Sequence, residues 1–120
     1  MGYILVIYDD ADDLENVRLF LSFCGYKVEA YSNWEEARSL FNRELDCEFL
    51  ITKGKMREIN GNDIALYIRN SQKSETPIVA IGSTGDDIDP GLFNSVLMTP
   101  LKLKVLEQRV ASFVAPMKWR

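Results

Sequence analysis

The chain contains no histidine, only two cysteines and few of the residue patterns that hold metals. Without histidine it lacks the commonest general base and the Ser/His and Cys/His pairs of nucleophilic catalysis, which excludes most hydrolase mechanisms. The spacing of Cys24 and Cys47 matches neither a zinc site nor a redox Cys-x-x-Cys, so we interpret both as reduced, packed thiols. A metal site built from His or Cys is therefore excluded.

Long apolar runs are also lacking. The longest near the N-terminus, Tyr3 to Tyr8, has only six residues and runs directly into Asp9 and Asp10. Such a run is too short for a signal peptide and far too short to cross a bilayer. We therefore expect a cytoplasmic protein with no membrane contact.

The net charge of the chain argues against nucleic-acid binding. The 14 Lys and Arg residues against 18 Asp and Glu give a net charge of −4, and the acids gather at Asp9–Glu15 and Asp86–Asp89. These clusters would repel a phosphate backbone, so we expect no direct nucleic-acid binding. With 120 residues, 47% of them hydrophobic, the chain is long enough for one core. We expect one domain over residues 1–115, with 116–120 a tail or the start of a linker.

Strand and helix patterns alternate along the chain. Short apolar or alternating segments predict five strands, over residues 3–8, 27–31, 48–52, 78–81 and 95–98. Residues recurring every three or four positions predict helices around 12–24, 34–41 and 63–68, and from about 102 to 114. Ser32 and Glu35 have capping-box spacing, and the stripe from Leu101 to Phe113 is expected to face the core. Pro90 and Gly91 argue against a full helix between the last two strands.

This alternation predicts a doubly wound α/β domain. Its parallel sheet would have five strands in the order 2-1-3-4-5, with helices on both faces and the fourth helix short or missing. Ligands of such sheets bind where the carboxyl ends of the strands meet. The residues expected at that edge follow the first, third, fourth and fifth strands: Tyr8, Asp9, Asp10, Lys53, Gly82, Ser83, Thr99 and Pro100.

Several spacings together resemble the receiver domains of two-component response regulators, over nearly the whole chain. They are the apolar strand ending in acids, the pair Gly25-Tyr26, Met56 followed five residues later by Gly61, Pro77 before the fourth strand, and Thr99-Pro100 where the family has Lys-Pro. The resemblance implies a flavodoxin-like CheY fold and a role in phosphorelay signal transduction. In that family two acids hold Mg²⁺, an aspartate accepts a phosphoryl group, and a Ser/Thr and a Lys bind it.

This chain departs from the family at most of those positions. The phosphoacceptor position carries Lys53, whose amine cannot form an acyl phosphate. Gly82 stands at the hydroxyl position, with Ser83 one residue late, and Thr99 replaces the lysine. Tyr8 takes the first acid position, so Asp9 and Asp10 are the remnant of the acidic site. We expect no cofactor, or at most weakly bound Mg²⁺.

Lys53 has two interpretations. It is either a cation that pairs with Asp9 or Asp10 and lowers the aspartate pKa, or a solvated loop lysine. The register of the third strand favours the ion pair.

The preferred functional interpretation is a pseudo-receiver that is not an enzyme. It would act without phosphorylation, as a protein-interaction or dimerisation module linked to an output or kinase domain, in two-component signalling or transcription regulation. Its candidate interaction face is the edge around Val96, Met98 and Leu101, which a missing fourth helix would uncover. The alternatives are a receiver that keeps a weak Mg²⁺ or phosphoryl response, and a flavodoxin-like module that binds a small molecule.

Overall fold

The computed structural model describes residues 2–116, so the tail expected at 116–120 lies, except for Pro116, outside the described residues. Five parallel strands form one sheet in the order β2-β1-β3-β4-β5. The strands are β1 (Tyr3–Ile7), β2 (Val28–Tyr31), β3 (Cys47–Lys53), β4 (Ile78–Gly82) and β5 (Ser95–Met98). The predicted strand order and parallel sheet are confirmed. Within the described part no helix is long and apolar enough to pass through a bilayer.

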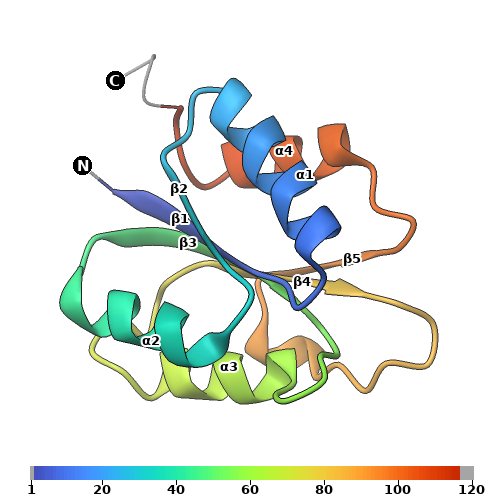
Figure 1. The fold of residues 1–120 in the computed structure, drawn as a ribbon. Helices are drawn as coiled ribbons and strands as arrows, with labels where there is room; N and C mark the ends of the chain where they lie inside the picture. Colours follow the sequence, from blue (N-terminus) through green and yellow to red (C-terminus); the bar gives the residue numbers. More distant parts are fainter. Residues whose placement is uncertain (1, 117–120) are drawn as a thin grey trace.

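Helices cover both faces of the sheet (Figure 1). On one side lie α1 (Ala11–Phe23) and α4 (Leu103–Ala111), and on the other lie α2 (Trp34–Arg43) and α3 (Gly61–Arg69). The strands alternate between two buried clusters, with Ile4 and Val6 facing α1 and α4 and Leu5 and Ile7 facing α2 and α3. Because β1 and β4 are buried on both faces, their sequences are continuous apolar runs, and β3 has such a run at its centre, from Phe49 to Ile51.

The structure confirms one predicted helix end and corrects two others. Gly25 has φ +99° after the C-cap of α1, the left-handed conformation expected there. The N-cap of α2 is Asn33, not Ser32, and its side chain accepts a hydrogen bond from the backbone N–H of Glu36. The last helix ends at Ala111, three residues earlier than predicted, so Phe113 lies beyond it and is 45% exposed.

No full helix connects β4 to β5. A single 3-10 turn, η1 (Pro90–Leu92), takes its place on the side of α2 and α3, as the proline and glycine predicted (Figure 1). Without a helix, this connection has few backbone hydrogen bonds of its own, and it must be held by side chains from elsewhere.

Arg69, at the end of α3, binds the end of this connection and also the segment that leads into β4. Its guanidinium donates four hydrogen bonds of 2.7–3.1 Å, to the carbonyl oxygens of Leu92, Ser74 and Thr76 and to Oδ1 of Asn94. These acceptors lie just before β4 and just before β5. One planar cation therefore joins the two chain segments that flank β4.

We predict that Arg69→Ala lowers the free energy of unfolding by about 2–4 kcal/mol, because several charge-assisted hydrogen bonds are lost and their acceptors are left unpaired. The exposed Arg18, which pairs with Glu15 at 2.6 Å on the surface of α1, provides the matched control. Arg18→Ala should cost far less, because solvent screens this exposed pair. Urea unfolding of the two variants measures the difference, and equal costs would contradict the role given to Arg69.

Candidate functional site

The carboxyl ends of β1, β3 and β4 meet at one edge of the sheet. Asp9 follows β1, Lys53 is the last residue of β3, and Gly82 is the last residue of β4. Strand β3 is thus one residue longer than predicted at this end, which places Lys53 on the strand and not in a loop. The position of its side chain is set by the register of the sheet.

Lys53 forms an ion pair with Asp9. Its Nζ lies 3.4 Å from Oδ1 of Asp9, and the two side chains are only 33% and 16% exposed. The ion pair favoured by the strand register is therefore present, with Asp9 as the partner. Asp10 instead caps α1, where its Oδ1 accepts a hydrogen bond from the backbone N–H of Asp13 at 2.9 Å.

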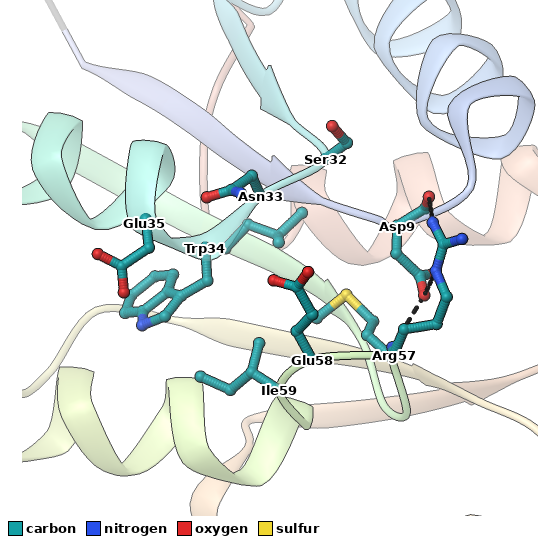
Figure 2. Close-up of a pocket in the computed structure, with 10 residues that line it drawn as sticks. Asp9, Ser32, Asn33, Trp34, Glu35, Arg57, Glu58 and Ile59 are labelled. Atoms are coloured by element: carbon teal, nitrogen blue, oxygen red, sulfur yellow. Dashed lines mark hydrogen bonds and ion pairs between the residues drawn. The ribbon is translucent and has the colours of Figure 1, made fainter.

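A second cation, Arg57, binds the same carboxylate (Figure 2). Its backbone N–H donates to Oδ2 of Asp9 at 3.0 Å, its Nε lies 3.5 Å from that oxygen, and its Nη2 donates to the backbone oxygen of Asp9 at 3.1 Å. Sequence reasoning missed Arg57, because it lies in the β3–α3 loop where no periodicity shows which way a side chain points. Its nearness in sequence to Lys53 was the only available signal.

These contacts determine the charge state of Asp9. Partial burial alone would raise the pKa of Asp9, but the N–H of Arg57 and the charge of Lys53 outweigh it, so this pKa lies below its ordinary value. The carboxylate stays ionised and compensated by cations. Tyr8, next to Asp9, is buried, and burial raises the pKa of its phenol. The position that matches the first acid of receiver domains therefore holds a neutral side chain.

The β4–β5 loop covers the next part of the edge. Ile88 packs directly over the backbone of Gly82 and Gly54: a Cβ on Gly54 would lie 2.7 Å from Cδ1 of Ile88, and a Cβ on Gly82 would overlap the same atom. The side chain of Ile88 therefore occupies the space that a serine or threonine at position 82 would need. The loop can pack in this position because residue 82 is a glycine, which carries no hydroxyl.

Polar contacts hold the loop in this position. Asn62 at the start of α3 donates to the backbone oxygen of Asp87 at 2.8 Å and accepts from the backbone N–H of Asp89 at 3.0 Å. The N–H of Ser83 donates to Asp86 at 2.8 Å, and the hydroxyls of Ser83 and Thr99 are 2.9 Å apart. The polar groups of Ser83 thus bind the loop and the end of β5.

The candidate interaction face is only partly uncovered. Val96 and Leu101 are half-buried and pack against the two core clusters, whereas Met98, at the end of the edge strand β5, is 50% exposed.

Among residues 2–116 no group of three or more acidic or cysteine side chains is arranged to hold a metal ion.

Known structures share this architecture. A response regulator receiver domain protein from Clostridium thermocellum aligns with a TM-score of 0.86, at 22% identity over 99% of this chain and 98% of that one. The response regulator TrrA of Thermotoga maritima, in complex with Mg²⁺ and BeF, aligns with a TM-score of 0.83, at 22% identity over 95% of this chain and 100% of that one. The chain has the receiver fold.

Curated protein sequences that resemble this chain include a response regulator. The receiver-fold domain is 26% identical over 89 residues, 74% of its length, to the response regulator SaeR of Staphylococcus aureus. The match covers 38% of that relative, so the domain spans well under half of its length. No protein-family model matches the sequence.

The packing of Ile88 predicts coupling between positions 82 and 88. Gly82→Ser in the receiver-fold domain should lower the free energy of unfolding by about 1–2 kcal/mol, because Cδ1 of Ile88 must move away. In an Ile88→Ala background the same serine should cost clearly less. A double-mutant cycle by urea unfolding measures this coupling, and an equal cost in both backgrounds would contradict the packing argument.

The low pKa of Asp9 predicts a pH-dependent contribution to stability. A carboxyl with a lowered folded-state pKa stabilises the fold above its unfolded pKa, near the ordinary value of 3.8, and this stabilisation disappears as pH falls through the lower folded value. Asp9→Asn should therefore cost about 1 kcal/mol at pH 7 and progressively less below pH ~4. Asp87→Asn, at an exposed loop position, is the control. A cost for Asp9→Asn that does not change with pH would refute the ionic origin.

Proposed function

We propose that this receiver-fold domain is a degenerate receiver that acts in two-component signalling without being phosphorylated. The similarity to SaeR and to structures of receiver domains supports the signalling role. The contacts at the carboxyl edge of the sheet support the loss of phosphorylation. The domain then works as a binding module and not as an enzyme.

The observation that carries the proposal is the ion pair between Lys53 and Asp9. Lys53 stands where the family has its phosphoacceptor, and an amine cannot form the acyl phosphate. Its charge also lies 3.4 Å from the carboxylate that would have to bind Mg²⁺. A divalent cation there would have to displace both Lys53 and Arg57, so these residues do not fit a magnesium site.

A second, independent feature supports the same proposal. In the family a hydroxyl near the fourth strand binds the phosphoryl group, but Gly82 has none and Ile88 fills the space above it. Thr99 replaces the family's lysine, and its hydroxyl contacts Ser83. Restoring a single residue would therefore leave the other phosphoryl-binding groups absent.

A module without phosphorylation would regulate through constitutive contacts. We infer a protein partner, an attached output or kinase domain, or a second copy, bound in the cytoplasm at the edge around Val96, Met98 and Leu101. The exposed Met98 side chain at the edge strand supports this choice, because edge strands offer unpaired backbone groups to a partner.

We predict that neither the wild-type protein nor Lys53→Asp is labelled by acetyl phosphate in the presence of Mg²⁺. Amide NMR with Mg²⁺ and then beryllofluoride should leave Asp9, Lys53 and Ser83 unshifted, whereas TrrA, known in complex with Mg²⁺ and BeF, serves as the positive control. Robust labelling of Lys53→Asp, or saturable shifts in the wild type, would overturn the proposal and favour a receiver with a residual phosphoryl response.

A further inference from the structure

A pocket of about 530 Å³ lies between the β2–α2 turn and the β3–α3 loop (Figure 2). Its apolar wall consists of Trp34, Met56 and Ile59. The proposed function uses only Asp9 and Arg57 at one side of this pocket and leaves the rest without a role. Its volume falls within the range of small-molecule sites, about 300–1,000 Å³.

The aromatic wall is fixed by its neighbours. The ring of Trp34 packs edge-on against Tyr67, with ring centroids 5.5 Å apart and planes at 78°. The hydroxyl of Tyr67 in turn donates to Oδ1 of Asn42 at 2.8 Å. Met56 is buried and belongs to the core cluster on this side of the sheet. A ligand would meet a wall that is already ordered, which lowers the entropy cost of binding.

The opposite wall is also ordered by backbone contacts. Lys55 and Asn60 form an antiparallel bridge across the β3–α3 loop, and the N–H of Gly61 donates to the oxygen of Gly54 at 2.9 Å. This closes the loop so that Glu58 lies near its tip. Figure 2 shows the carboxylate of Glu58 extending from the loop toward the β2–α2 turn.

The ion pairs around the pocket are unevenly distributed. Three carboxylates line it, and two of them are paired: Asp9 with Lys53 and Arg57, and Glu35 with Arg38 at 2.8 Å. Within residues 2–116 Glu58 has neither a hydrogen bond nor an ion pair. The carboxylate without a partner is therefore Glu58, an exposed side chain that lines the pocket together with the indole of Trp34 and the thioether of Met56.

We propose that this pocket binds a small organic cation, a protonated amine on an apolar body. The ammonium group would pair with Glu58, and the body would pack against Trp34, Met56 and Ile59. Aromatic side chains also attract cations through the ring face, which adds to the preference. A phosphate or carboxylate is disfavoured, because Glu58 would repel it, because Arg57 is already bound to Asp9, and because Glu35 and Glu36 already complement the positive end of α2.

The probes are 2-phenylethylamine and hexylamine, with 2-phenylethanol and 3-phenylpropanoate as neutral and anionic counterparts of the aromatic amine. Amide NMR of the full chain should show saturable shifts of Trp34, Glu58 and Ile59 with at least one amine. Binding should be at least tenfold weaker for the alcohol and absent for the acid. Failure of both amines, or equal shifts from all probes, would overturn the proposal.

Two matched variants identify the charge that matters. Glu58→Gln removes the carboxylate without changing its size and should weaken amine binding at least tenfold, whereas Glu107→Gln on α4, across the sheet, should leave it unchanged. Thermal unfolding of each variant checks that the fold is retained. Amine binding that survives Glu58→Gln would refute the proposal.

A third probe tests whether the cation belongs to a small molecule or to a protein partner. Nα-acetyllysine amide presents the lysine side chain of a protein partner. If it saturates the pocket while both amines fail, the small-molecule proposal falls and the pocket becomes a docking point for a partner's lysine. This proposal goes beyond the pseudo-receiver function, and the two can fail separately, because the beryllofluoride experiment reads Lys53 and Ser83 and this one reads Glu58.

Discussion

Arg69 donates four hydrogen bonds to the chain on both sides of β4, and the form of the functional edge depends on them. They hold the entry to β4 and the entry to β5 in the absence of a connecting helix. The loop between the two strands is held by these bonds at the end that leads into β5, and it folds over the carboxyl ends of β3 and β4. Asn62 then fixes the middle of the loop, and Ile88 settles over Gly54 and Gly82.

The resulting edge combines a weak ion pair with a steric contact. The partly exposed pair of Lys53 and Asp9 contributes about 1 kcal/mol, enough to set a charge state but not to hold the fold. The packing of Ile88 is steric, so salt and pH do not weaken it. Together they leave an edge in which a carboxylate is already compensated by cations and the neighbouring space is filled.

Much of the fold could be predicted, because local patterns determine it. Apolar runs and three-to-four spacing located the strands and helices, and parallel strand order brought Asp9 and Lys53 to one edge. The cap at Asn33, where Ser32 had been predicted, was missed because both side chains can cap a helix. Arg57, Arg69 and Ile88 were missed because their partners are distant in sequence or lie in loops without periodicity. Long-range side-chain contacts leave no such signal.

The fit between Ile88 and Gly82 also has a consequence for sequence variation. While Ile88 keeps this position, any side chain introduced at position 82 meets its methyl group, so a hydroxyl there requires the side chain of Ile88 to rotate away or to become smaller. A smaller residue at 88 by itself opens a void and restores no chemistry. Positions 82 and 88 are therefore expected to vary together, so that a residue larger than glycine at 82 accompanies a smaller or differently oriented side chain at 88.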